Sequence, residues 1–164
     1  MTATDKEKIQ IAANLGIKMP FRAMKVSHAV PIPYGVLCAF LEQESGGGQN
    51  IYGHDPGWFC GKGPVTRENY AVYKAGRAAH NSQGVGPMQL TYYAFQDRAD
   101  ALGGCWRPYV NMLVGAQILK EYFVKYKTWH LAAYHYNGSG EAAERYADAV
   151  TEKIKKYVSR MQAD

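Results

Sequence analysis

The segment VLCAFLEQES, residues 36–45, decides how the fold of this chain is read. Apolar side chains fill most of its first half, and two carboxylates, Glu42 and Glu44, lie near its end. Successive residues of an α-helix are about 100° apart, so Glu44 falls on the same face as Leu37 and Leu41. Glu42 lies about 160° away from Glu44. The segment therefore predicts a helix that buries one carboxyl, Glu44, among apolar side chains.

A carboxyl that is held against apolar and aromatic side chains resists ionisation, so its pKa rises and it can remain protonated near neutral pH. That is the state a general acid needs in order to protonate a leaving oxygen. The alternative is that Glu44 lies in water at a frayed helix end, which periodicity alone does not exclude. Glu42 is expected to be an ordinary solvated helix residue.

Length and composition favour one mainly α domain over residues 1–164. With 47% hydrophobic and 20% charged residues, the chain can bury a sizeable core, which excludes disorder and a coiled coil as its main state. The segment 46–65 is rich in glycine and aromatic residues and predicts an extended loop or a small β element after the helix that carries Glu44. Helices are predicted over residues 5–15, 20–29, 34–45, 66–79, 88–102, 109–126, 128–136 and 141–162, with 109–126 as the buried central helix.

The distribution of charged and apolar residues limits the kinds of partner that the chain is expected to have. The net charge of +5 is spread over both halves of the sequence, which suits an anionic polymer but argues against nucleic acid, since no helix carries a basic stripe. No apolar run approaches the ~20 residues that span a bilayer, so stable membrane insertion is not expected. The amino terminus lacks a secretory apolar segment, so the protein is expected to stay in the cytosol in which it is made.

The cysteines and histidines give no metal or thiol chemistry. Cys38, Cys60 and Cys105 lack CxxC spacing, so three reduced thiols are expected, with one Cys60–Cys105 bridge as the alternative. The five histidines do not form an HExxH motif, which argues against a metallopeptidase. Nothing in the sequence indicates an activated cysteine nucleophile. No metal or organic cofactor is expected.

Two later motifs extend the pattern that Glu44 begins. The segment GVGPMQL, residues 84–90, predicts a glycine-bracketed turn leading into a helix, where a close backbone and an amide side chain can line a groove. The segment 131–140 predicts a helix end rich in aromatic residues, followed by the Asn137-Gly138 turn, and Tyr136 there can offer a hydroxyl beside a buried acid.

Taken together, the motifs Glu44-Ser45, Gly86-Pro87-Met88-Gln89-Leu90, Tyr136-Asn137-Gly138 and the last helix with Tyr146 resemble the soluble lytic transglycosylases and goose-type lysozymes. Their order and spacing match over roughly residues 8–158, and the resemblance extends to the catalytic domains of bacteriophage endolysins. It implies a lysozyme-like fold and a monomeric, bacteriolytic enzyme that cuts peptidoglycan between N-acetylmuramic acid and N-acetylglucosamine. Glu44 would be the catalytic acid. The substrate-binding residues that the resemblance implies are Ser45, Gly86, Met88, Gln89, Tyr136 and Asn137.

The chain departs from the family pattern in ways that bear on the mechanism. Pro87 stands where the family usually has an apolar residue, and residues 57–83 form a longer insertion whose part in the cleft is open. The segment 51–55 resembles the region in which goose-type lysozymes carry an Asp that positions the attacking water, which would be Asp55. Thr91 stands where those lysozymes sometimes carry another Asp, so a second acid must be Asp55 alone. Alternatively, Asp55 only caps its Asp-Pro-Gly turn.

Two reaction outcomes remain open at this point. If Asp55 holds a water on the far face of the sugar, inverting hydrolysis follows, with the two carboxyls roughly 6.5–9.5 Å apart. If no base positions water, the 6-hydroxyl of the sugar attacks and leaves a 1,6-anhydro end, with Glu44 as acid and then base. A non-catalytic module that binds cell-wall glycan, or a phage structural module, is the alternative from another class.

The resemblance also implies a biological setting. A phage endolysin without an export signal is expected to wait in the host cytoplasm until a holin releases it to the cell wall, or to be carried in a virion. The chemistry of the host wall and a further wall-binding domain are not indicated by the sequence.

Overall fold

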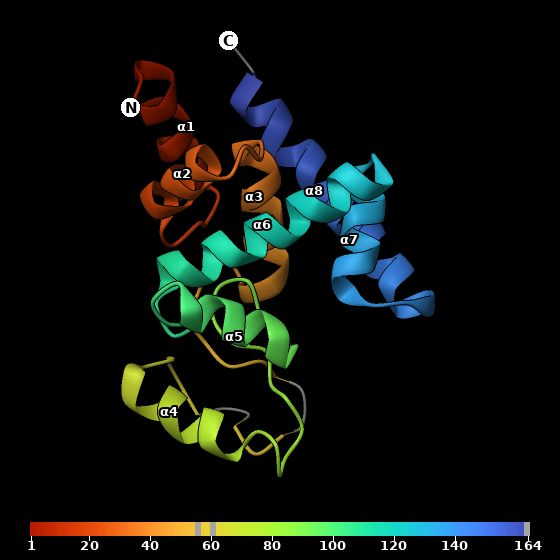
Figure 1. Ribbon diagram of the computed structural model, residues 1–164. Helices are drawn as coiled ribbons and strands as arrows, with labels where there is room; N and C mark the ends of the chain where they lie inside the picture. Colours follow the sequence, from red (N-terminus) through yellow and green to blue (C-terminus); the bar gives the residue numbers. More distant parts are fainter. Residues whose placement is uncertain (55–56, 60–61, 163–164) are drawn as a thin grey trace.

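The computed structural model describes residues 1–54, 57–59 and 62–162 (Figure 1). These residues form eight helices and no β-strand, and their buried apolar side chains join in one core, so the predicted mainly α single domain is confirmed. The helices are α1 (Ala3–Asn14), α2 (Pro20–Ala29), α3 (Tyr34–Ser45), α4 (Arg67–Gly76), α5 (Tyr93–Ala101), α6 (Pro108–Tyr126), α7 (Trp129–Asn137) and α8 (Gly140–Gln162). Among the described residues, no helix is both long enough and apolar enough to cross a bilayer.

Helix α3, which carries Glu44, runs through the middle of the fold (Figure 1). Every residue from Tyr34 to Leu41 is buried, because α2 and α8 pack against this helix. Gly35 allows the close approach of α8, since a side chain there would meet Tyr157 and the backbone of Val158 at 3.4 Å. The helix is therefore a fixed support for the acid at its last turn.

Helix α6 is the buried central helix that its continuous apolar pattern predicts. It begins at Pro108, a residue suited to the first helical position because its missing N–H needs no partner there. Helices α2, α5 and α7 pack around it. At Gly115 it touches the side chain of Met88, where a Cβ would come within 2.6 Å. The central helix thus backs the turn that contains the second sequence motif.

The predicted helix over residues 88–102 is wrong at its start, because α5 begins only at Tyr93. The preceding residues pair as a tight hairpin instead: Val85 and Leu90 exchange backbone hydrogen bonds of 3.1 and 3.0 Å. Gln89 in this turn has a φ of 49°, a left-handed conformation that no helix continues. In the glycine-rich segment, isolated bridges between Ile51 and Pro64 and between Tyr52 and Val85 are the observed β element, and no strand forms in the described part.

The insertion of residues 57–83 lies below α5 in Figure 1 and contains α4. Its aromatic side chains form a cluster with Tyr52 of the glycine-rich segment; Phe59 packs 4.9 Å from the Tyr52 ring, and Trp58 stacks on His80 at 4.4 Å. Trp58 is thus part of this packing.

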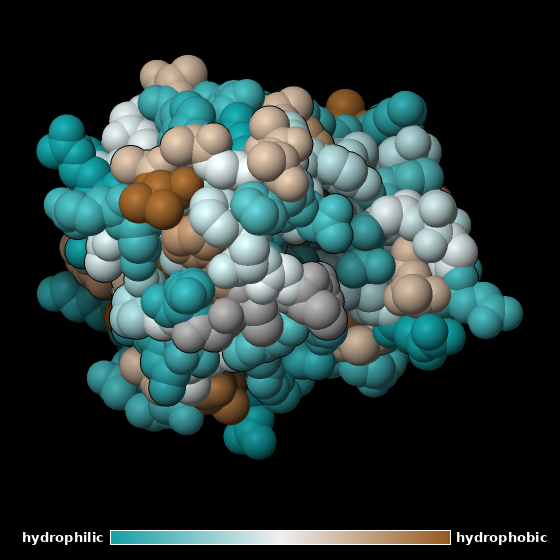
Figure 2. All heavy atoms as spheres, turned by 90° about the horizontal axis from the view of Figure 1, so that it is seen from below, coloured by the Kyte–Doolittle hydropathy of each residue, from teal (hydrophilic) through white to brown (hydrophobic). Residues whose placement is uncertain are grey.

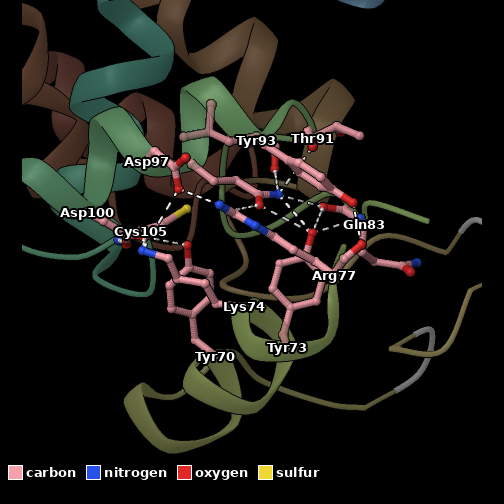
Figure 3. A network of polar contacts seen from close by, with 12 residues as sticks. Tyr70, Tyr73, Lys74, Arg77, Gln83, Thr91, Tyr93, Asp97, Asp100 and Cys105 are labelled. Carbon is pink, nitrogen blue, oxygen red and sulfur yellow. Dashed lines mark hydrogen bonds and ion pairs between the residues drawn. The ribbon is translucent and has the colours of Figure 1, made fainter. Parts of the chain in front are cut away.

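A polar network fastens this insertion to α5 (Figure 3). Arg77, only 9% exposed, donates to Gln96 Oε1 at 2.8 Å and pairs with Asp97. Tyr93 donates its hydroxyl to the backbone carbonyl of Arg77, and Lys74 pairs with Asp100 at 2.7 Å. Since a buried guanidinium needs such partners, α4 and α5 are held in one arrangement.

Two further details concern residues that the sequence singled out. Glu42 is not an ordinary solvated residue, because both of its carboxylate oxygens accept from Lys156 Nζ at 2.8 Å and thereby join α3 to α8. Cys38 and Cys105 are buried free thiols. Burial raises the pKa of each to about 12, so neither is a thiolate near neutral pH. Cys60 lies outside the described residues.

Candidate active site

A cleft of about 290 Å³ opens at the carboxyl end of α3, between the α5 side of the molecule and α7. Figure 2, which views the molecule from below, shows a mostly hydrophilic face with a hollow to the right of its centre, on the side where Figure 1 draws α7. Residues from four parts of the chain line the cleft, and most of them are polar or aromatic. They are Glu44, Gly84, Gln89, Leu90, Thr91, Tyr92, Phe95, Tyr136 and Asn137.

Glu44 is the only carboxylate among the described residues that line the cleft. Burial raises the pKa of Glu44 from 4.5 to about 7, and a hydrogen bond from the Tyr146 hydroxyl to Oε1 opposes part of this rise. At neutral pH the protonated and ionised forms are therefore both populated. This is the behaviour required of a group that gives up and regains a proton during a reaction.

Two tyrosines flank this acid. Phe40, which is fully buried on α3, packs against the rings of Tyr136 and Tyr146 at centroid distances of 5.9 and 6.5 Å. Burial, and then the nearby charge of Glu44, raise the pKa of both tyrosines well above 10. Both hydroxyls therefore remain protonated donors. Tyr146 donates to Glu44, and Tyr136 donates to the Met88 carbonyl at 2.7 Å.

A buried asparagine of the central helix holds the opposite wall of the cleft. Asn111 Oδ1 accepts from the Met88 N–H at 2.9 Å, and its Nδ2 donates to the Val85 carbonyl at 2.8 Å. Gly86 has a φ of 78°, and a Cβ there would meet the Asn111 amide at 2.5 Å. Only glycine suits this position, because the turn needs both the left-handed backbone and the space.

Gln89 presents its side chain between this wall and the glycine-rich segment. Its Nε2 donates to the carbonyls of Ile51 at 3.0 Å and of Gly86 at 2.9 Å. A non-glycine residue at positive φ is uncommon and costs free energy, which these two bonds offset. The conformation directs Gln89 into the cleft wall, where it is only partly buried.

Four of the predicted site residues meet in the cleft: Glu44, Gln89, Tyr136 and Asn137. Ser45, Gly86 and Met88 do not line it, because they are buried behind its wall; Ser45 is 3% exposed and Met88 is fully buried. Their part in substrate binding stays a prediction, and the contacts that the structure shows for them support the cleft wall from behind. Ser45 Oγ donates to the Pro87 carbonyl at 2.7 Å and ties α3 to the turn. Asp55 lies outside the described residues, and its role stays a prediction.

The sequence did not single out Thr91, Tyr92 or Phe95 as lining residues, whereas Gly84 and Leu90 belong to the segment 84–90 that was expected to line a groove. Tyr92 and Phe95 were assigned to the interior of a helix that begins only after Tyr92. The signal that could have found them is the aromatic spacing itself, since residues 92 and 95 lie on one side of the first turn of a helix that starts at 93.

The arrangement offers a proton donor in a cleft with neutral hydrogen-bonding neighbours. In the described part of the chain, no three His, Cys, Asp or Glu side chains are grouped to hold a metal ion. Comparison of the chain with protein-family models, with curated proteins and with solved structures found no match.

Proposed function

We propose that this protein is a peptidoglycan glycosidase with a lysozyme-like fold, which cleaves the β-1,4 bond between N-acetylmuramic acid and N-acetylglucosamine. The observation that carries the proposal is Glu44, a single carboxyl with a pKa of about 7 at the edge of a cleft. A carboxyl poised in this way suits proton transfer to a glycosidic oxygen near neutral pH. The motif resemblance of Glu44, Gln89 and Tyr136 to muralytic enzymes supports the choice of substrate.

In the proposed reaction, Glu44 gives its proton to the glycosidic oxygen while the bond to the anomeric carbon breaks. Positive, oxocarbenium-like charge develops on the muramic sugar at the same time. The carboxylate that remains accepts the hydrogen bond from Tyr146, which stabilises it until it takes up a proton again. Tyr146 is therefore a positioning residue for the acid.

Two fates of the sugar cation are compatible with this first step. In hydrolysis, Asp55 takes a proton from a water that attacks from the opposite face. In lytic transglycosylation, the 6-hydroxyl attacks, and Glu44 takes its proton to give a 1,6-anhydro end. The second route needs no second carboxylate, because Glu44 serves as acid and then as base.

Mass spectrometry of digested muropeptides tests this choice. Hydrolysis gives reducing ends, whereas transglycosylation gives ends that are lighter by one water molecule. If Asp55 positions the water, Asp55→Asn is expected to lose about 100-fold or more in hydrolysis and to leave any anhydro product unchanged. Full hydrolysis by Asp55→Asn would remove this residue from the mechanism. Failure of the wild-type protein to release any muropeptide, with binding to walls intact, would favour a non-catalytic glycan-binding module.

The pH dependence should follow the protonation of Glu44. Because the acid must be protonated, kcat/KM is expected to fall as the pH rises through about 7. Tyr146→Phe removes the hydrogen bond that lowers the pKa of Glu44, so this fall should move to higher pH, by about one pH unit. Turbidity clearing of purified walls across pH measures the shift. Tyr126→Phe, outside the described cleft lining, is the matched control, and an unmoved profile in Tyr146→Phe would contradict the assigned role.

The proposed setting is bacteriolysis by a phage endolysin, with release to the wall by a holin and the peptidoglycan of the host as substrate. The protein is proposed to act as a monomer. The net charge of +5 suits an anionic cell envelope as the surface to which the protein binds.

A further inference from the structure

A second groove adjoins the cleft at the beginning of α5. It has a volume of about 490 Å³, and three of its lining residues are aromatic. Its lining residues are Ser82, Tyr92, Tyr93, Ala94 and Phe95. Tyr92 and Phe95 also line the cleft that holds Glu44, so the two hollows adjoin at these side chains. A polymer that is bound across Glu44 would therefore extend along this groove.

Tyr92 presents the largest exposed aromatic surface of the groove, with 57% of the residue accessible. Its ring packs edge to face with Phe95, at a centroid distance of 5.5 Å and an interplanar angle of 83°. One edge contact of this kind restricts the ring while a face stays open for another group. The ring is thus oriented without being covered.

The backbone beneath this ring is held in place. The Tyr92 carbonyl accepts the N–H groups of Phe95 and Gln96 at 3.0 and 3.1 Å, as the first bonds of α5. The fully buried Gln96 side chain donates a hydrogen bond to the Leu90 carbonyl at 2.9 Å and accepts one from Arg77 of the insertion. Because these hydrogen bonds fix the backbone that carries Tyr92, this side chain loses little conformational entropy on binding a ligand.

We propose that Tyr92 and Phe95 form an additional sugar subsite, which takes a further ring of the same glycan strand beyond the bond that Glu44 breaks. The inference rests on the proposed function. A pyranose ring has an apolar face of C–H groups and a polar edge, so it packs on an aromatic face while its hydroxyls stay in water. We assign the glycan strand as the occupant, because the groove adjoins the cleft in which the strand would be cut. The enzyme consequently prefers long strands to short ones.

The test compares peptide-free glycan strands of two lengths, tetrasaccharides and long strands. In Tyr92→Ala, the ratio of kcat/KM on long strands to that on tetrasaccharides should fall about tenfold, mainly through KM. Tyr92→Phe keeps the ring and should keep the ratio. Tyr109→Ala removes a tyrosine of α6 that is 36% exposed and outside both lining sets, and it should leave both rates as in the wild type.

Several outcomes overturn the subsite. An equal loss on both lengths would assign Tyr92 to the reacting sugars alone, and an unchanged ratio would show that the groove binds no sugar. A length preference that appears only when stem peptides are attached would show that the groove binds the peptide and not a sugar.

Binding in the Glu44→Gln background separates this inference from the proposed function. If Tyr92→Ala weakens retention of long strands about tenfold although the wild type cleaves nothing, the proposed function fails and the subsite stands. If Glu44-dependent cleavage is intact and the length ratio does not move, the subsite alone fails.

Discussion

Glu44→Gln is expected to abolish the clearing of purified cell walls, with a fall in rate of about 1,000-fold or more. Glutamine has nearly the shape of the acid but carries no proton that it can give to the glycosidic oxygen. General acid–base catalysis contributes about 100- to 10,000-fold to enzymatic rates, so removal of the carboxyl should remove most of the activity. The decrease of turbidity in a suspension of walls measures this loss.

Glu42→Gln is the matched control, since the same substitution is made two residues away. Glu42 points toward Lys156 of α8 and does not line the cleft. Its loss weakens an ion pair that is partly exposed, which is worth about 1 kcal/mol or less, so most of the activity should remain. Equal loss of activity in both variants would indicate damage to α3 and not loss of an acid.

The stability of Glu44→Gln provides a second control. Burial raises the folded-state pKa of Glu44 above 4.5, so the folded protein binds this proton more tightly than the unfolded chain does. The tighter proton binding therefore adds to the free energy of unfolding. This contribution is complete below about pH 4.5 and is lost as the pH rises through about 7. Glutamine has no such loss. At pH 8 the variant should therefore unfold at the same temperature as the wild type or a higher one, although it is inactive.

The parts of the fold that follow from continuous local patterns could be predicted from the sequence. Helices α3 and α6 are apolar over long stretches, and a segment of that kind has few alternatives to a buried helix. Helix α8 shows what local patterns leave open: of two neighbouring alanines, Ala142 is exposed and Ala143 is buried. An error of one residue rotates a stripe by about 100°, and only the packing of α8 on α3 fixes it.

The start of α5 could not be predicted, because distant residues decide it. Met88, Gln89 and Leu90 have an apolar and polar pattern that suits a helix. The pairing of Val85 with Leu90 and the amide of Asn111, 23 residues beyond Met88, select a turn instead. Tertiary hydrogen bonds override local propensity in such cases.

The candidate site likewise combines features that the local sequence predicts with features that only tertiary packing determines. Helical spacing places Glu44 on the apolar face of α3, but it left open a solvated position at a frayed helix end. Its partner Tyr146 lies 102 residues away, so the hydrogen bond that tunes Glu44 depends on how α8 packs on α3. The support from Ser45 to Pro87 spans 42 residues and is likewise invisible to periodicity. Sequence patterns thus point to the candidate acid, whereas packing supplies its surroundings.

Asn111→Ala is expected to produce the largest loss of stability among the variants considered, about 3 kcal/mol. The side chain is fully buried, and its removal leaves the Met88 N–H without its partner and takes one of the two hydrogen bonds from the Val85 carbonyl. Each unpaired buried group costs about 1–3 kcal/mol, and the cavity adds to this. Thermal unfolding followed by circular dichroism should show a midpoint lower by about 6–12 °C. Asn14→Ala, at an exposed helix end, should change the stability by about 0.5 kcal/mol or less.

The same variant should also lose activity at temperatures at which it is still folded. Asn111 fills the space beside Gly86, so its loss frees the turn that aims Gln89 at the cleft. A misplaced positioning group can cost about 100-fold in rate even when the acid is intact. The pH at which kcat/KM falls should stay near 7, because the hydrogen bond between Tyr146 and Glu44 is not touched. A variant with normal activity and a lower unfolding midpoint would show that the wall needs Asn111 for stability only.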